Sequence, residues 1–314
     1  GAGSNGEVYN SDELQGGATL TGTGEAGAAL TVTVGTHVQT TTVDGNGDWS
    51  VTYPSGTFQP GEYSETLTIV ATDSFGNSST TTDTFVIDTV SEVAISTSTA
   101  GGDGTINNAE QGAGVTLTGS AQPGSTVNVT FGNTTLPATV AANGSWSVDF
   151  PSSAVATGET TQSVTAVATD ANGNSSTATG SVQIDTLVNS FNFTSTAGGA
   201  DGVINAIESQ AGLIVTGQVE PGSTVQVALG GATAIATVAA NGSWTATFGA
   251  GQLPTGTQTT TMTATATDAA GNSSSIDQTV VVDTEAGALT ISTAPVEGDD
   301  IVNEAEAADG VVLR

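Results

Sequence analysis

The sequence predicts an all-β chain built as a linear array of tandem β-sandwich domains, and three observations support this prediction. First, the same landmarks return every 97 or 98 residues, most clearly Trp49, Trp146 and Trp244. Second, the chain has 42 glycines, few aromatic residues and a surplus of Thr, Val, Ser and Ala, which suits short strands joined by tight turns. Third, apolar and polar residues alternate in short runs. A period of about 100 residues fits an independently folding domain rather than a solenoid unit.

Aspartates that return with the same period mark the repeats. They are Asp73, Asp170 and Asp268 before a Gly-Asn pair, and Asp88, Asp185 and Asp283 at the repeat ends. The resulting divisions are repeat 1 (1–89), repeat 2 (90–186), repeat 3 (187–284) and the opening of a fourth repeat (285–314). Residues 1–4 are typical of a cloning remnant, and we expect the chain to be a segment of a longer protein. The chain begins at an acidic segment that follows the first strand in the other repeats. Repeat 1 therefore either lacks this first strand or differs in phase.

Repeat 2 contains about seven short runs that are expected to form strands. These runs are 93–98, 115–118, 127–131, 137–140, 146–150, 164–168 and 181–184. Turns are expected at the Pro-Gly pair of Gln122–Ser125, at the Asn-Gly pair of Ala141–Gly144 and at Asp170–Asn174. About seven strands with a turn signal every 8–12 residues or so is the pattern of an immunoglobulin-like sandwich.

Three motifs that suggest ligand binding have a simpler structural interpretation. Each tryptophan alternates with apolar residues on one strand face, which favours core packing over a sugar-stacking platform. The Thr-x-Thr run of residues 261–267 is typical of the outward face of a half-buried strand rather than of an ice-binding array. Asp44–Asp48 resembles a calcium loop, but its counterparts Ala141–Ser145 and Ala239–Ser243 lack carboxylates, so a hairpin turn is the better interpretation.

The charge of the chain excludes two classes of partner. Thirty-one acidic residues against one Lys or Arg give a formal net charge of −30. Nucleic acid and anionic membrane surfaces are bound largely through Lys and Arg, so neither is an expected partner. Such a charge destabilises compact states by self-repulsion unless cations neutralise it, and Ca²⁺ and Mg²⁺ are the cations that prefer carboxylate and carbonyl oxygens.

The composition also argues against an enzyme. The chain has one histidine, His37, and no cysteine or lysine to act as a nucleophile. Zinc ligands are lacking, and a two-carboxylate glycosidase would need a cleft that small sandwiches do not offer. Without cysteine or lysine, neither disulfides nor Lys–Asn isopeptide bonds reinforce the domains, which leaves metal as the expected reinforcement.

An acidic motif and the expected strand order place carboxylates together at the domain junctions. Asp103-Gly-Thr-Ile-Asn107-Asn-Ala-Glu110 returns as Asp201-Gly-Val-Ile-Asn205-Ala-Ile-Glu208. In a seven-strand sandwich the loop after the first strand lies at the far end, beside the exit of the last strand. The loop between the last two strands of the following domain faces back toward the same place. Three acidic elements from two domains and their linker therefore converge.

We predict that Ca²⁺ binds at these junctions, because it takes six to eight oxygens or so and tolerates irregular geometry. A plain polar turn remains the alternative for each Asp-x-x-Gly-Asn motif alone. The predicted set between repeats 2 and 3 is drawn from Asp103, Asn107, Glu110, Asp185, Asp268 and Asn272. The set between repeats 1 and 2 is drawn from Glu7, Asn10, Asp12, Glu13, Asp88, Asp170 and Asn172. A further set, Asp201, Asn205, Glu208 and Asp283, is expected to be incomplete within this chain.

Several motifs resemble bacterial Ig-like repeats from the extender regions of giant Gram-negative adhesins, many of them exported by type I secretion (the RTX type). They are Pro-Gly-Ser-Thr-Val at 123–127 and 221–225, Asn-Gly-Ser-Trp at 143–146, Ala-Thr-Asp-x-x-Gly-Asn-Ser at 168–175 and 266–273, and Ile/Val-Asp-Thr at each repeat end. The resemblance covers essentially the whole chain. Repeat 1 departs from it, with Ala26-Gly-Ala in place of Pro-Gly-Ser and a weaker acidic segment, which makes its junction the less certain metal site.

The resemblance implies a non-catalytic spacer on the bacterial cell surface. Such repeats hold a distal binding domain away from the cell in adhesion or biofilm, and they stiffen in extracellular Ca²⁺. Their partners are then the neighbouring repeats of the same chain, with no insertion into a membrane. The alternative is an array that itself binds a ligand, such as a glycan or another copy of the protein.

Overall fold

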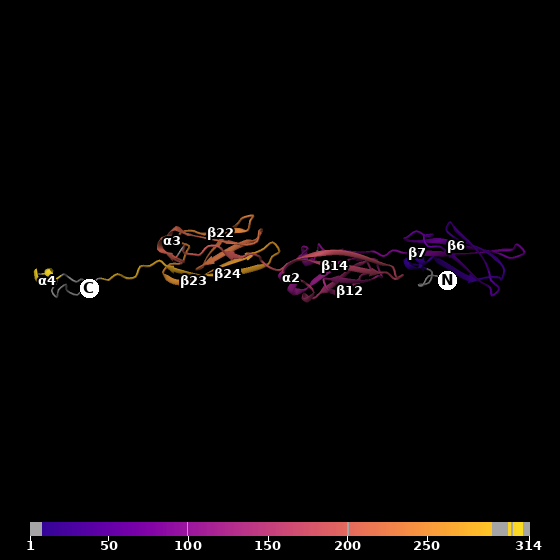
Figure 1. Cartoon of the computed structure of the whole chain (residues 1–314), viewed down its shortest axis with the longest axis horizontal. Coiled ribbons are helices and arrows are strands. Elements are labelled where there is room, and N and C mark those ends of the chain that lie inside the picture. The colour runs from indigo at the N-terminus through magenta and orange to yellow at the C-terminus, as the bar shows by residue number, and fades with distance from the viewer. Residues whose placement is uncertain (1–7, 99, 200, 291–300, 303, 310–314) are drawn as a thin grey trace. The chain divides into compact units, whose positions relative to one another are not determined.

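The computed structural model describes residues 8–290, except 99 and 200, and residues 301–309, except 303 (Figure 1). It confirms the all-β prediction, since the only helices described are short. The chain forms two compact units, one of Gly1–Leu187 with Ala270–Asn272 and one of Val188–Ala269 with Ser273–Arg314. Among the described residues, no helix is long and apolar enough to cross a membrane.

Repeat 1 lies in the first unit and has seven strands and one helix. They are β1 (Val8–Tyr9), α1 (Ser11–Gly16), β2 (Ala18–Thr23), β3 (Ala29–Val34), β4 (His37–Thr42), β5 (Asp48–Tyr53), β6 (Glu62–Thr72) and β7 (Ser78–Asp88). One sheet has the order β1-β7-β6-β3-β4, and β2 and β5 form a two-stranded sheet.

Repeat 2, also in the first unit, has all seven expected strands and a short additional one. Its elements are β8 (Val93–Ser96), a 3₁₀ turn (Ala100–Gly102), β9 (Thr105–Ile106), α2 (Asn108–Ala113), β10 (Val115–Ala121), β11 (Thr126–Phe131), β12 (Thr134–Val140), β13 (Ser145–Phe150), a second 3₁₀ turn (Ser152–Ala154), β14 (Glu159–Thr169) and β15 (Ser175–Asp185). The expected hairpin turn at Ala141–Gly144 is confirmed, because Gly144 N–H donates to the Ala141 carbonyl at 2.9 Å.

Repeat 3 lies in the second unit and follows the same order. Its elements are β16 (Asn192–Phe193), β17 (Val203–Asn205), α3 (Ala206–Ala211), β18 (Leu213–Gln218), β19 (Thr224–Leu229), β20 (Ala232–Ile235), β21 (Thr237–Val238), β22 (Ser243–Phe248), β23 (Thr257–Thr267) and β24 (Ser273–Asp283). A last helix, α4, spans Glu304–Asp309. Within repeat 3, β22 lies in one layer and β23 and β24 in the other (Figure 1).

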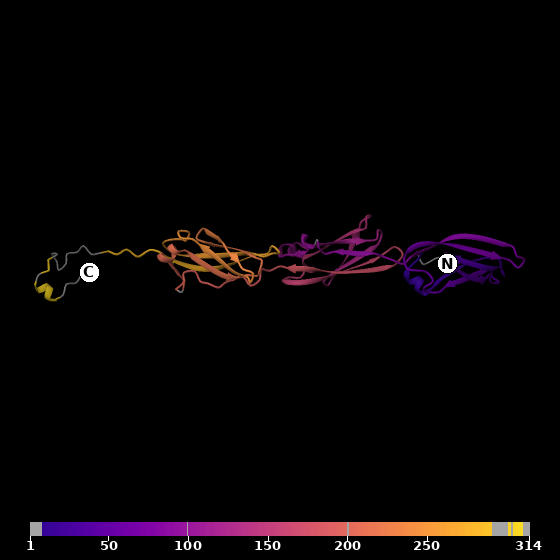
Figure 2. The ribbon, with the colours of Figure 1, turned by 90° about the horizontal axis from the view of Figure 1, so that it is seen from above.

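Two features differ from the sequence prediction. The acidic segment from Asp103 to Glu110 is not only a loop, since it contains β9 and the first residues of α2. The last strand of repeat 2 begins at Ser175 rather than Ser181, because the Ser- and Thr-rich residues 175–180 pair with residues 164–169 of β14 although they lack apolar alternation. Figure 2 shows these long strands running lengthwise through their repeat.

Short parallel pairings place each acidic motif at the end of the last strand of its own repeat. Ile106 of β9 lies opposite Ile184 of β15, so that Asn107 follows beside Asp185. β1 pairs with β7 and β17 with β24 in the same parallel sense. The expected proximity of the motif and the terminal aspartate is therefore confirmed within each repeat.

The tryptophans lie in the cores, as predicted. Trp49, Trp146 and Trp244 are 9%, 2% and 1% exposed. Each pairs across the sheet with a glycine, and in repeat 2 this is Gly119. A Cβ atom on Gly119 would lie 2.2 Å from the Trp146 ring, so only glycine leaves room for the indole.

A candidate metal-binding junction between repeats 1 and 2

Both repeats that form this junction belong to the first unit, and the predicted ligands Asn10 and Glu13 lie at its centre as caps of α1. The Asn10 side-chain oxygen accepts from the backbone N–H of Glu13 at 3.0 Å, and the Glu13 carboxylate accepts from the N–H of Asn10 at 3.0 Å. This capping box satisfies two backbone donors that a helix start otherwise leaves unpaired. The same box recurs at Asn107 with Glu110 and at Asn205 with Glu208.

The Asp-x-x-Gly-Asn motif forms a turn held by its own aspartate. In repeat 2 the Asp170 carboxylate accepts from the backbone N–H groups of Asn172 and Asn174 at 2.9 Å each, and from the Asn174 side-chain amide at 2.8 Å. Asp73 makes the corresponding bonds in repeat 1, including one of 2.7 Å from the Asn77 amide. Hydrogen bonds from Asn77 are the main reason why the pKa of Asp73 lies below its usual value.

The turn of repeat 2 contacts the end of repeat 1 through hydrogen bonds. The Asn174 amide donates to the Asp88 carbonyl oxygen at 2.8 Å, while its side-chain oxygen accepts from Ser11 N–H at 2.9 Å. The Asn172 amide donates to the Asp88 carboxylate at 2.7 Å, and the Asn10 amide donates to the Asn172 carbonyl oxygen at 2.9 Å. Asp88 is 5% and Asn174 4% exposed, so this polar contact is shielded from solvent.

Within the described part of the chain, the junction concentrates negative charge with no Lys or Arg nearby. Asp88 and Asp170 both reach Asn174, at 3.4 Å and 2.8 Å between the carboxylate oxygens and its amide nitrogen. The single Lys or Arg of the chain is Arg314, which lies outside the described residues. Hydrogen bonds from amides offset part of the cost of burying a carboxylate, and a bound cation offsets more of it.

Asn272, in the tripeptide Ala270–Asn272 of the same unit, makes the counterparts of two Asn174 contacts at the end of repeat 2. The Asn272 amide donates to the Asp185 carbonyl oxygen at 2.9 Å, and its side-chain oxygen accepts from Asn108 N–H at 2.7 Å. The counterpart of Asn272 in repeat 2 is therefore Asn174. The residue predicted from the sequence at this position is Asn172, whereas an alignment of the two Gly-Asn pairs identifies Asn174.

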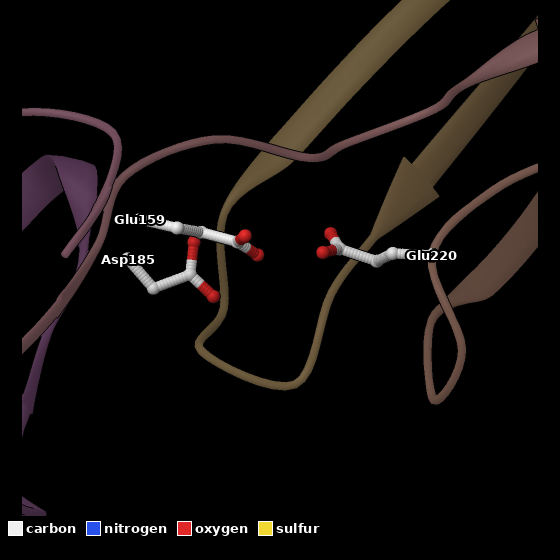
Figure 3. Close-up of side chains that lie close together, drawn as sticks. All are labelled: Glu159, Asp185 and Glu220. Carbon is white, nitrogen blue, oxygen red and sulfur yellow. The ribbon is translucent and has the colours of Figure 1, made fainter.

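Two glutamates missed by the sequence analysis lie opposite the terminal aspartates. Glu62 pairs with Asp88 across β6 and β7, and Glu159 pairs with Asp185 across β14 and β15. Carboxylate oxygens of Glu159 and Asp185 lie within 4.8 Å of each other, and Figure 3 shows the two side chains together. Figure 3 also draws Glu220, which in the second unit accepts a hydrogen bond from Asn189 N–H at 3.2 Å. The position of each glutamate could have identified it. Each is the first residue of the strand that pairs with the strand ending in the terminal aspartate.

Other predicted ligands are turn or helix residues. Asp103 accepts from Thr105 N–H at 2.9 Å, and Asp201 accepts from Val203 N–H at 3.1 Å. Asp12 is exposed on the first turn of α1.

The last three predicted ligands differ in their surroundings. In repeat 3, Thr257 takes the place of the missed glutamates and donates to the Asp283 carboxylate at 2.9 Å. Asp268 is buried, and Glu7 lies outside the described residues.

Two other polar sites are structural. Asp44 accepts from the N–H groups of Asn46 and Asp48, which lowers its pKa and closes the turn between β4 and β5 as predicted. His37 packs edge-on against Phe58, with ring centroids 5.4 Å apart.

The sequence matches the model of the bacterial Ig domain in three places, at residues 10–88, 103–185 and 203–283. A search among curated proteins finds no match.

Solved structures of bacterial adhesins are similar to this chain. One, from a study of host cell surface retention of a 1.5-MDa bacterial ice-binding adhesin, is 27% identical with a TM-score of 0.50, covering 89% of this chain and 95% of its own. A Ca²⁺-stabilised adhesin with which an Antarctic bacterium binds ice is 30% identical with a TM-score of 0.44, covering 96% of this chain and 77% of its own. A tetra-tandem repeat from the extending region of a large adhesion protein is 23% identical with a TM-score of 0.33. The match covers 90% of this chain and 74% of its own.

Proposed function

The chain belongs to the bacterial Ig domain family, and on that premise we propose that it is a non-catalytic extender segment of a large bacterial cell-surface adhesin, stiffened by Ca²⁺ at its interdomain junctions. The partners of each repeat are its neighbours in the chain. The segment acts outside the cell, where it holds an adhesive domain of the same protein at a distance, as in adhesion or biofilm growth.

The similarity to a chain of a bacterial ice-binding adhesin supports the extender role, because it extends over nearly the full length of both chains. The observation that carries the proposal is the docked turn at Asp170–Asn174. Its contacts join two consecutive repeats through buried polar groups rather than leaving them on a free linker. A spacer needs such joints, whereas a catalyst needs a reactive group in a cleft.

Ca²⁺ suits the junction because of the donors present there. Asp88 and Asp170 supply carboxylates, Asn172 supplies a backbone carbonyl oxygen, and Glu62 stands opposite Asp88. Oxygen donors of this kind in irregular arrangement favour Ca²⁺, which binds at about 2.3–2.6 Å, over the strictly octahedral Mg²⁺. A bound cation would take the place of the Asn172 amide as the partner of the Asp88 carboxylate.

Small-angle scattering with parallel melting curves tests the proposal, on the chain in excess Ca²⁺, in excess Mg²⁺ and in excess chelator. We expect a larger maximum dimension and a higher melting temperature in Ca²⁺ than in chelator or Mg²⁺, since a ligand that binds the folded form alone stabilises it. Identical curves in all three conditions would remove Ca²⁺ from the junctions and leave a passive linker.

Variants at Asp185, the terminal aspartate of repeat 2, sharpen the same test. Asp185→Ala should reduce the Ca²⁺-dependent change in maximum dimension while each repeat stays folded. Asp149→Ala is the matched control, because Asp149 is an exposed strand aspartate of the same repeat that accepts a hydrogen bond from Thr116. Equal dimensions of the Asp185 variant and the wild type in Ca²⁺ would contradict a role for Asp185.

A further inference from the structure

The Asn172 side chain makes the shortest hydrogen bond to the carboxylate of Asp88. Its amide donates to one Asp88 oxygen at 2.7 Å. The two other hydrogen bonds that the described residues give this carboxylate reach its second oxygen at 3.4 Å each, from the Asn174 amide and from Val90 N–H. Because Asp88 is buried, the Asn172 amide is the main group that offsets the cost of removing its charge from water.

The backbone of Asn172 is held on both sides of this side chain. Its N–H donates to the Asp170 carboxylate at 2.9 Å, and its carbonyl oxygen accepts from the Asn10 amide at 2.9 Å. Asn172 itself is half-buried. The turn of repeat 2 and the start of α1 therefore fix the position from which the Asn172 amide meets Asp88.

The turn at the end of repeat 2 lacks an amide at the corresponding position. The residue two before its final asparagine is Ala270. This turn docks like the turn of repeat 2, since the Asn272 amide donates to the Asp185 carbonyl oxygen at 2.9 Å. A methyl side chain donates no hydrogen bond, so the Asp185 carboxylate receives none from this position.

An amide and a cation compete for the same Asp88 oxygen. Ca²⁺ binds a carboxylate oxygen at about 2.3–2.6 Å, which leaves no room for a hydrogen-bond donor on the same side of that oxygen. The positive end of the amide dipole also faces the place that the ion would take. Loading of this junction with Ca²⁺ therefore has to break the Asn172 bond, whereas at the end of repeat 2 no bond from Ala270 has to break.

We propose that Asn172 sets the Ca²⁺ dependence of its junction, because its amide takes the place of the cation at Asp88. The inference rests on the proposed function, in which Ca²⁺ binds at the junctions. With Asn172, repeats 1 and 2 stay joined without the ion, and their junction binds it more weakly. With Ala270, the end of repeat 2 binds the ion more tightly and depends on it more. When Ca²⁺ is removed, the end of repeat 2 is the contact that loosens.

An NMR titration of the chelator-treated chain with CaCl₂ measures the two places separately. The backbone N–H of Ser11 donates to Asn174 at the junction of repeats 1 and 2, and that of Asn108 donates to Asn272 at the end of repeat 2. Each amide signal gives the Ca²⁺ concentration at which its own contact is half-loaded. In the wild type we expect the Asn108 signal to reach its midpoint at a lower Ca²⁺ concentration than the Ser11 signal.

Exchanging the two side chains should exchange the two midpoints. Asn172→Ala should lower the Ser11 midpoint roughly tenfold and leave the Asn108 midpoint unchanged, since a hydrogen bond to a charged group contributes about that factor. Ala270→Asn should raise the Asn108 midpoint by a similar factor, because it supplies the missing amide.

Melting curves in excess chelator give a readout that needs no bound ion. Asn172→Ala should lower the melting temperature by about 5 °C in chelator, because the buried Asp88 carboxylate loses its main partner. Excess Ca²⁺ should restore it, whereas a purely structural role would lower stability in both conditions. Asn143→Ala is the matched control, since Asn143 is an exposed asparagine before a glycine in the same repeat. It should leave both midpoints unchanged.

Two outcomes of the titration would overturn the inference alone. A Ser11 midpoint that Asn172→Ala leaves unchanged would show that the amide does not compete with the ion. A raised midpoint would make the Asn172 side-chain oxygen a ligand. Loss of any Ca²⁺ response at both amides, in the wild type and in the variants, would instead overturn the proposed function together with this inference.

Discussion

The turns Asp73–Asn77 and Asp170–Asn174 have the same internal hydrogen bonds but opposite surroundings. Both aspartates accept from two backbone N–H groups and from the final asparagine amide. The repeat 1 turn is exposed, and its Phe75 is 89% accessible, whereas Asn174 in the repeat 2 turn is buried against Asp88. The Asp-x-x-Gly-Asn turn therefore folds in the same way whether or not another repeat packs against it. The contact with repeat 1 uses the Asn174 side chain, which also closes the turn.

The strongest test of this comparison is Asn174→Ala against Asn77→Ala. Asn174→Ala leaves the buried Asp88 carbonyl and Ser11 N–H without their partner, so we expect a loss of about 2–4 kcal/mol in unfolding free energy. Asn77→Ala removes only an exposed bond to Asp73 and should cost about 1 kcal/mol or less. Urea unfolding measures both, and similar losses would mean that docking contributes little.

A second test compares Asp88→Asn with Asp73→Asn in Ca²⁺ and in chelator. If Ca²⁺ at 100 times its Kd stabilises the wild type by about 2.7 kcal/mol, Asp88→Asn should lose more than half of that gain. Asp73→Asn should keep all of it, because Asp73 lies at the exposed turn. Differential scanning calorimetry provides the measurement, and a full Ca²⁺ response in Asp88→Asn would exclude Asp88 as a ligand.

The glycines of the two turns should respond alike. Gly76 and Gly173 have φ angles of 88° and 93°, which residues with a Cβ rarely adopt. Replacing either with alanine should cost about 1 kcal/mol, since the strain is local to the turn. A much larger cost at Gly173 would show that docking constrains the turn backbone.

The smallest expected effect is the pH dependence of Asp73. Its folded pKa is lowered below 3.8, so its contribution is present above the unfolded pKa and is lost as pH falls through the folded pKa. Asp73→Asn should therefore flatten the stability curve slightly below pH 4 or so. An NMR titration of the Asp73 carboxyl checks the direction, and a value above 3.8 would contradict it.

Sequence reasoning identified every long strand of repeat 2, because the period-two alternation and the Gly-containing turns are local signals. It missed α2, although Asn107 and Glu110 have the spacing of a capping box, because the same two residues also fit the pattern of metal ligands. It also missed the first half of β15, where serine and threonine replace the apolar residues that mark a strand. At the ends of repeats 1 and 2 it identified Asp88, Asp170 and Asp185, but not Asn174, Glu62 or Glu159.

The sequence alone determined the repeat, the fold class, the core tryptophans and the identity of the acidic elements, because each depends on spacing along one chain. Only the tertiary structure decided which side chains meet. Asn174 and Asp88 are 86 residues apart, and their contact depends on how β7 ends and how the next repeat presents its turn.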